Sequence, residues 1–326
     1  MAQRSGDVLD CLVVGGGPAG LTAALYLARF KRRFLVVDEG APRAAWIPTS
    51  HNVPVFAEGI PGPEILARQR AHAGRYGVAV VAGRVARLRR PPGGHFEAEV
   101  EMGGGGGAVR RVRARRVLLA TGAVDVEPDL PDLPDAVRRG LVRYCPICDG
   151  YEARGRRIAV IGHGAHGLGE AAFVARTYSD DVTLLTLGRR LELGPEQREV
   201  AERHRIRVVE EPVAALEVRG GRIAAVRTGG GAEHRFDALY SALGLEYRTG
   251  LALALGAGHD AQGALVVDGH NQTTVKGLYA AGAVVRGLDQ IVVAMGHAAV
   301  AATAIHNRCE LPTEEEPDGA GGERPA

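Results

Sequence analysis

Lysine is nearly absent from this chain: Lys31 and Lys276 are the only two, although Lys and Arg together number 40. Acidic residues number 38, so the formal net charge is only +2. A chain so close to neutrality has no broad field of one sign to attract a polyanion. The sequence therefore gives no reason to expect a nucleic-acid partner.

Long apolar runs are also missing. The longest, residues 291–305, is too short to cross a bilayer and contains His297. The N-terminal stretch MAQRSGDVLD lacks the apolar core of a secretory signal. Four cysteines in 326 residues do not make a disulfide-rich scaffold. We expect a cytoplasmic protein with no membrane span.

The N-terminal part of the chain has the pattern of a strand, a glycine-rich turn, a helix and a second strand. Apolar residues 11–14 and 34–37 have the character of strands buried on both faces. The glycines let backbone N–H groups approach a pyrophosphate at a helix N-terminus, and an acid after the second strand can accept a hydrogen bond from a ribose. The residues predicted to contact this dinucleotide are Gly15, Gly17, Pro18, Ala19, Gly20, Asp38 and Glu39.

The same unit occurs a second time. A predicted strand at 158–161 leads into a second G-x-G-x-x-G motif, and a strand at 182–187 follows the next helix. Two dinucleotide units in one chain suggest two redox cofactors that exchange electrons. The alternative is a duplicated fold in which only one site is still occupied. The second motif consists of Gly162, Gly164 and Gly167.

Between the two units lies Cys145-Pro146-Ile147-Cys148, followed at once by Asp149. A zinc site needs four ligands, and the chain has no second CxxC pair. A permanent disulfide here closes a short loop that stabilises little, and a reducing cytoplasm would open it. Redox exchange through a thiolate fits best.

These motifs, in this order, resemble the low-molecular-weight thioredoxin reductase family of flavoprotein disulfide reductases. The resemblance extends to about Asn307, and its further motifs are Ala120-Thr121-Gly122 and "GLYAAGAVVRGLDQIVVAMGHAAVAA" from Gly277. It implies an α/β fold of two Rossmann-like, three-layer ββα domains, the second inserted into the first. An FAD domain would comprise residues 1–123 and 246–307, and an NAD(P)H domain with the CxxC would comprise residues 124–245. The acidic, Pro/Gly-rich tail, residues 308–326, is expected to be disordered.

The resemblance also implies the chemistry. NADPH would supply electrons to FAD, Cys148 would exchange them with the flavin, and Cys145 would attack the disulfide of thioredoxin or a similar small dithiol protein. Asp149 would protonate the leaving thiolate; alternatively it is a turn or capping residue before Gly150. Family members are commonly homodimers. Further expected cofactor contacts are Asn52, Thr121, Gly122, Gly282, Gln290, Ile291, Arg189 and Arg190.

The sequence departs from the family pattern in three places. Ala283 replaces an Asp that holds the ribityl chain of FAD, which removes a hydrogen bond at a cost of about 1–3 kcal/mol; we still expect FAD to bind. Arg189 and Arg190 follow Gly188 in place of a His-Arg-Arg phosphate site, and they are either phosphate ligands or solvated residues. Asn52 is either a flavin contact or a turn residue, in a loosely matched segment where Val55 replaces a common Gly.

Two other functions stay open at this point. A dithiol oxidase on the same fold would close a disulfide in a small-molecule product and pass the electrons to oxygen. The weaker 2′-phosphate site favours that interpretation. A redox sensor that binds flavin without turnover is supported only by Ala283.

Overall fold

The computed structural model describes residues 8–92, 94–104, 107–130, 133–219 and 222–311. The chain divides into two compact units. The first comprises the chain up to Ala45, then Pro63–Val124, then everything from Glu246 onward. The second comprises Trp46–Gly62 and Asp125–Leu245. The short segment Trp46–Gly62 therefore groups with the later unit, although it lies between two pieces of the first.

A parallel sheet forms the centre of the first unit. Its strands run in the order β3-β2-β1-β5-β16. A further strand, β4, is antiparallel to both β3 and β5, so the long strands β3 and β5 extend beyond the parallel sheet into a meander. The bounds are β1 (Leu9–Val14), β2 (Phe34–Asp38), β3 (Val80–Arg89), β4 (Phe96–Met102), β5 (Val109–Leu119) and β16 (Leu278–Ala280).

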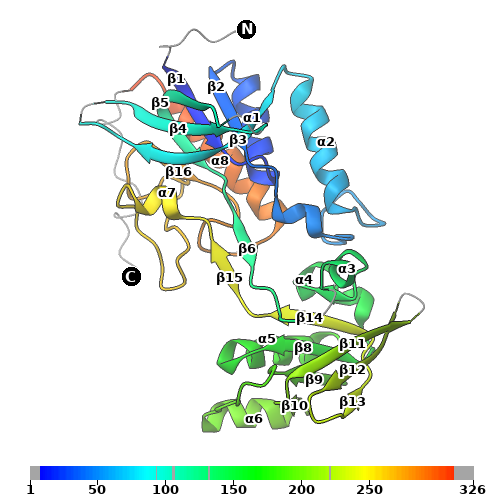
Figure 1. The fold of residues 1–326 in the computed structure, drawn as a ribbon. Helices are drawn as coiled ribbons and strands as arrows, with labels where there is room; N and C mark the ends of the chain where they lie inside the picture. Colours follow the sequence, from blue (N-terminus) through cyan, green and yellow to red (C-terminus); the bar gives the residue numbers. More distant parts are fainter. Residues whose placement is uncertain (1–7, 93, 105–106, 131–132, 220–221, 312–326) are drawn as a thin grey trace. The chain divides into compact units, whose positions relative to one another are not determined.

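Successive residues of β1 point to opposite faces of this sheet, and both faces are buried. Leu12 and Val14 pack on the side of the meander, while Cys11 and Val13 pack against α1 (Pro18–Arg29) and α8 (Ile291–Arg308). These two helices lie together on that face (Figure 1). A strand covered on both sides must be apolar throughout, which explains the unbroken hydrophobic runs of the sequence. The remaining helical elements are η1 (Arg43–Trp46), α2 (Gly62–Gly74) and α7 (Gly250–Leu253).

A buried arginine fixes the end of α8. The Arg116 side chain is 1% exposed, and its Nη2 donates to the main-chain carbonyls of Arg308 at 2.7 Å and Leu311 at 2.9 Å. The first four residues of the tail, 308–311, are therefore part of the described structure. The rest of the expected disordered tail, 312–326, lies outside the described residues.

A second parallel sheet, β10-β9-β8-β14-β7, forms the centre of the second unit. Helix α5 covers one face, and a three-stranded antiparallel sheet, β11-β12-β13, packs on the other. The parallel strands are β7 (Val142–Arg143), β8 (Ile158–Gly162), β9 (Val182–Leu185), β10 (Arg207–Val209) and β14 (Ala238–Ala242). The antiparallel strands are β11 (Val213–Arg219), β12 (Arg222–Thr228) and β13 (Glu233–His234). The helices are α3 (Leu133–Arg138), α4 (Pro146–Asp149), η2 (Tyr151–Ala153), α5 (Gly164–Thr177) and α6 (Pro195–Arg203).

The chain passes between the units within a short two-stranded ladder, β6 (Ala123–Asp125) and β15 (Leu245–Tyr247). The fold class expected from the sequence is confirmed: each unit is a Rossmann-like sheet with helices on one face and antiparallel strands on the other. No helix in the described ranges is long and apolar enough to span a membrane. Which nucleotide each unit binds stays a prediction.

Candidate active site

The two cysteines of the CxxC motif form a disulfide at the start of a single helical turn. Cys145 is the N-cap of α4 and has extended backbone, and Pro146 occupies the first helical position, where its missing N–H is not needed. The Cα atoms of Cys145 and Cys148 are 5.4 Å apart. Between the cysteines, the Ile147 side chain is 45% exposed. The turn thus presents the disulfide beside an apolar side chain.

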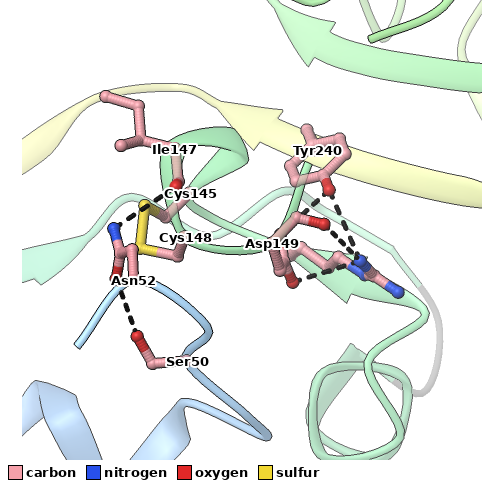
Figure 2. The surroundings of a disulfide bond; sticks show 8 residues. Ser50, Asn52, Cys145, Ile147, Cys148, Asp149 and Tyr240 are labelled. Carbon is pink, nitrogen blue, oxygen red and sulfur yellow. Dashed lines mark hydrogen bonds and ion pairs between the residues drawn. A yellow bond between two sulfur atoms is a disulfide. The ribbon is translucent and has the colours of Figure 1, made fainter. Parts of the chain in front are cut away.

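Segment 46–62 is tied to this turn from outside (Figure 2). The Asn52 side-chain nitrogen donates to the Ile147 carbonyl at 3.3 Å, and the Ser50 hydroxyl donates to the Asn52 side-chain oxygen at 2.9 Å. The backbone N–H of His51 donates to the Cys148 carbonyl at 3.3 Å. Asn52 thus holds the disulfide turn, and its expected contact with the flavin stays a prediction.

Asp149 is the last residue of α4, and its side chain is only 16% exposed. Burial is the largest influence on its pKa and raises it, while the Arg143 guanidinium and the Tyr240 hydroxyl lower it. The backbone turns tightly at the next residue. A Cβ on Gly150 would lie 2.4 Å from the Tyr178 ring and 2.5 Å from the Pro146 carbonyl oxygen, so glycine is required there. The motif CxxCDG is therefore one packed unit.

The first glycine turn forms a cradle that only glycine can build. A Cβ on Gly20 would lie 1.9 Å from the Gly15 carbonyl oxygen, and one on Gly15 would lie 2.3 Å from the Ala120 carbonyl oxygen. Gly17 is the N-cap of α1, and a Cβ on it would lie 3.8 Å from the Pro42 side chain, an ordinary contact distance. Pro18 and Ala19 then begin the helix. A helix N-terminus in a close glycine turn fits the phosphates of a dinucleotide.

The two acids at the end of β2, Asp38 and Glu39, differ in their contacts and exposure. Asp38 accepts a hydrogen bond from the Gly16 backbone N–H at 2.9 Å and lies 3.5 Å from an Arg70 nitrogen. The Glu39 side chain is 60% exposed and lies 3.9 Å from Arg84. Asp38, rather than Glu39, is the carboxylate held against the glycine turn.

The motif around Gly282 packs against the start of α1, beside the first glycine turn. A Cβ on Gly282 would lie 3.1 Å from that of Ala19 in α1 and 3.4 Å from that of Ala294 in α8. Gln290 is the buried N-cap of α8, and Ile291 is its first residue. The structure thus brings the start of α1, the start of α8 and the Gly282 turn together. These residues fit an FAD, although Ala283 offers no carboxylate to it.

Thr121 and Gly122 follow directly after β5. The Thr121 hydroxyl donates to the Arg248 carbonyl at 2.7 Å, and Gly122 has a φ of 70°. That value lies in the left-handed region, which favours glycine. The pair therefore forms the turn by which the chain leaves the first sheet.

The second glycine motif packs as closely as the first. A Cβ on Gly167 would lie 2.5 Å from the Gly162 carbonyl carbon, and Gly164 opens α5 with a φ of 54°. Beyond β9, the turn at Leu187 and Gly188 presents Arg189 and Arg190, which are both exposed. Neither guanidinium is paired with a carboxylate of the described residues. This arrangement fits a pyridine nucleotide whose phosphates are met by the α5 N-terminus and by these two arginines.

Arg143 and Tyr240, the side chains that hold Asp149, were not identified from the sequence. Arg143 stands two residues before the motif, but Tyr240 lies on a distant strand, so no local spacing links the two. The described residues contain no group of three His, Cys, Asp or Glu side chains able to hold a metal ion. They therefore supply no further ligands for a zinc site at the cysteine pair. The other two cysteines, Cys11 and Cys309, are buried free thiols of the first unit.

Comparison with known proteins gives one family. Residues 9–298 match the model of pyridine nucleotide-disulphide oxidoreductases. Thioredoxin reductase of Streptomyces coelicolor is 32% identical over 295 residues, which cover 86% of this chain and 87% of that protein. An alkyl hydroperoxide reductase component of Xanthomonas campestris pv. phaseoli is 31% identical over 309 residues, which cover 91% of this chain but only 56% of that longer protein.

Solved structures agree over nearly the whole chain. HlmI is 30% identical, with a TM-score of 0.83 and 96% of each chain covered. The thioredoxin reductase from Streptococcus pyogenes is 25% identical, with a TM-score of 0.82, and the match covers 93% of this chain and 98% of that one. The thioredoxin reductase family uses FAD and NADPH.

Proposed function

This chain belongs to the pyridine nucleotide-disulphide oxidoreductase family and is a thioredoxin reductase-like disulfide oxidoreductase, and on that premise we propose that it reduces thioredoxin or a similar small dithiol protein with NADPH. The observation that carries the proposal is the disulfide in the α4 turn, followed at once by the partly buried Asp149, whose side chain is 16% exposed. A disulfide next to a partly buried carboxyl can exchange both electrons and a proton with a bound partner.

In this proposal Cys145, Cys148 and Asp149 have different roles. Bound FAD and NADPH would supply the two electrons that open the Cys145–Cys148 disulfide. The Cys145 thiolate then attacks the substrate disulfide, and Asp149 gives a proton to the sulfur that leaves. Cys148 attacks the resulting mixed disulfide, which restores the Cys145–Cys148 bond and releases the second substrate sulfur.

The proposed cofactor contacts follow the same division. FAD would lie against Gly15, Gly17 and Gly20, with Asp38 toward its ribose; the Gly282 turn and the α8 N-terminus complete its site. NADPH would lie at Gly162, Gly164 and Gly167, with its 2′-phosphate toward Arg189 and Arg190. The glycine contacts described above support both assignments, because a Cβ at several of these positions would strike backbone.

A visible spectrum of the purified protein, before and after anaerobic NADPH, tests the proposal. Bleaching of the flavin band by NADPH, reversed by oxidised thioredoxin, is the expected result. Cys145→Ser should abolish the reversal, while Cys309→Ala, at a buried thiol of the first unit, should preserve it. A protein with no flavin band after addition of FAD would contradict the proposal and point to the missing carboxylate at Ala283.

A dithiol oxidase is the second candidate. The Ile147 side chain between the cysteines is 45% exposed, which suits a small apolar dithiol. The proposed 2′-phosphate site has two exposed arginines, Arg189 and Arg190, in place of a His-Arg-Arg site, so its grip on NADPH is weaker. An oxidase would consume oxygen with a small dithiol and without pyridine nucleotide. A flavin band unmoved by NADPH but bleached by dithiothreitol would favour this function over the reductase.

A further inference from the structure

The Asp149 carboxyl has two donors fixed on opposite oxygens. The Tyr240 hydroxyl donates to Oδ1 at 2.9 Å (Figure 2), and Nη1 of Arg143 lies 3.1 Å from Oδ2. The Arg143 side chain is 22% exposed and that of Asp149 is 16% exposed, so water screens the pair only in part. A carboxyl held at both oxygens cannot turn freely.

Both donors are themselves anchored by the sheet of the second unit. Tyr240 is fully buried in the middle of β14 and pairs in register with Arg143 on β7. Nε of Arg143 donates to the Gly140 carbonyl at 2.9 Å, and its guanidinium carbon lies 5.9 Å from the centre of the Tyr240 ring. The parallel sheet, through Arg143 and Tyr240, therefore fixes the position of the Asp149 carboxyl more than the short turn α4 does.

Three other titratable groups face this carboxyl. Glu152, on η2, opposes ionisation of Asp149, and His51, from segment 46–62, favours it; both effects are smaller than that of Arg143. His51 and Glu152 lie 3.8 Å apart, so they partly cancel each other. The Tyr178 ring covers the neighbouring glycine, and burial, followed by the nearby Asp149, raises the pKa of Tyr178. Arg143 and Tyr240 remain the two groups that contact the carboxyl directly.

We propose that Arg143 and Tyr240 are positioning residues for proton exchange at the dithiol: they hold Asp149 in place and stabilise its carboxylate after it gives up a proton. This inference rests on the proposed role of Asp149 as proton donor. In the balanced cycle, the leaving sulfur of the substrate takes the proton from Asp149, and Asp149 regains one from the Cys148 thiol as that sulfur becomes the second nucleophile. The carboxylate that exists between these two transfers is the species both donors favour.

Removing either donor should therefore make Asp149 keep its proton to a higher pH. Tyr240→Phe removes one hydroxyl and keeps the buried ring; Arg143→Met removes the cation and keeps the aliphatic stem. We expect the titration of Asp149 to move upward by about one pH unit in each variant. Tyr178→Phe is the matched control, because its ring lies beside Gly150 while no hydrogen bond joins its hydroxyl to Asp149 in the described residues.

The titration is measured by carboxyl ¹³C NMR of the complete oxidised protein labelled at aspartate, with Asp149→Asn to assign the signal. In parallel, the fully reduced protein is mixed with hydroxyethyl disulfide, and the rate of Cys145–Cys148 disulfide formation is followed against pH. Neither measurement uses NADPH or thioredoxin, so both can be made even where the proposed reductase activity is not found.

The expected result is an upward shift of the Asp149 signal in both variants, matched by the pH profile of the exchange rate, with Tyr178→Phe close to the unaltered protein. An Asp149 titration unchanged in Tyr240→Phe, in a protein with normal unfolding behaviour, overturns the proposal. A signal that shifts while the pH profile of exchange stays fixed also overturns it, because Asp149 then passes no proton to the dithiol. Should Arg143→Met fail to fold, Tyr240→Phe decides alone.

Discussion

The Asn52 side-chain nitrogen donates a hydrogen bond to the main-chain carbonyl of Ile147, 3.3 Å away, across 95 residues of sequence. Together with the bond from the His51 N–H to the Cys148 carbonyl, it makes segment 46–62 part of the wall around the disulfide turn. The turn is a single helical turn of four residues, too short to be stable by its own hydrogen bonds. Its conformation thus depends on these outside contacts.

Asn52→Ala should therefore loosen the segment. Loss of this side-chain bond removes about 1 kcal/mol, which corresponds to roughly fivefold faster exchange of the His51 amide hydrogen. Hydrogen exchange with mass spectrometry of peptides from residues 46–62 gives the measurement. Ser50→Ala leaves the Asn52 nitrogen in place and should accelerate exchange less. Equal exchange in Asn52→Ala and the unaltered protein would show that the bond contributes nothing.

Val55 is a β-branched residue in the left-handed region, with a φ of 73° and 94% exposure. Such a conformation costs a β-branched side chain roughly 1–2 kcal/mol, and glycine avoids most of it. Because glycine also loses more entropy on folding, Val55→Gly should raise the free energy of unfolding by only about 0.5–1 kcal/mol. Urea unfolding checks this value.

Val208→Gly is the matched control for that prediction. Val208 is 38% exposed and lies in the regular strand β10 of the same unit. The same substitution there should lower stability, since glycine weakens a strand interior. If both variants were destabilised to a similar extent, backbone strain at Val55 would not be the cause.

Gly167 and Gly169 lie on the same helix, α5, in contrasting surroundings. A Cβ on Gly167 would strike the Gly162 backbone at 2.5 Å, whereas one on Gly169 would have no described atom within 4 Å apart from its chain neighbours and the nearby backbone of α5 itself. Gly167→Ala should lose about 1–3 kcal/mol of stability and weaken NADPH binding. Gly169→Ala should gain up to about 1 kcal/mol through helix propensity. Calorimetry of unfolding and of NADPH binding measures both effects in each variant. Strong NADPH binding by Gly167→Ala would argue against a nucleotide site at this turn.

His297 on α8 should make the stability of the protein depend on pH. Burial lowers its pKa, and its Nδ1 has no hydrogen-bond partner among the described residues. A histidine with a depressed folded pKa takes up its proton more readily when unfolded, so stability is lost as pH falls below about 6.5.

His297→Leu should remove that loss. Between pH 7.5 and 5.5, the unaltered protein should lose more stability than the variant, by no more than about 1 kcal/mol after allowance for solvent screening. Urea unfolding at several pH values provides the test. The exposed His270, replaced in the same way, is the control and should retain the pH dependence of the unaltered protein. Parallel pH curves for His297→Leu and the unaltered protein would refute the assignment.

Local sequence pattern was sufficient for the parts of the molecule that are built locally. Each glycine motif, with its flanking strands and helix, occupies one stretch of chain, and the packing of Gly15 against Gly20 arises within that stretch. The CxxC and Asp149 are likewise consecutive. The expectation that glycine suits the position of Val55 has a physical reason, because Val55 has a positive φ.

The surroundings of the disulfide were not predictable in this way. Arg143 and Tyr240 meet Asp149 because β7 and β14 are neighbours in a parallel sheet, and Asn52 reaches Ile147 from another part of the chain. Such contacts depend on three-dimensional pairing over 91 and 95 residues, which no periodicity in a single sequence records. The side chains around Asp149 were therefore found only in the structure, whereas the cysteine pair and Asp149 were predicted from the sequence.

The discontinuity of the second unit has a practical consequence for protein engineering. Its residues come from Trp46–Gly62 and Asp125–Leu245, so a fragment cloned as 125–245 alone would carry the disulfide without Ser50, His51 and Asn52. Such an excised fragment would leave the cysteine turn open to solvent on the side those residues now cover. A fragment or domain-swap chimera meant to keep these contacts should therefore join 46–62 to 125–245 by circular permutation or a linker.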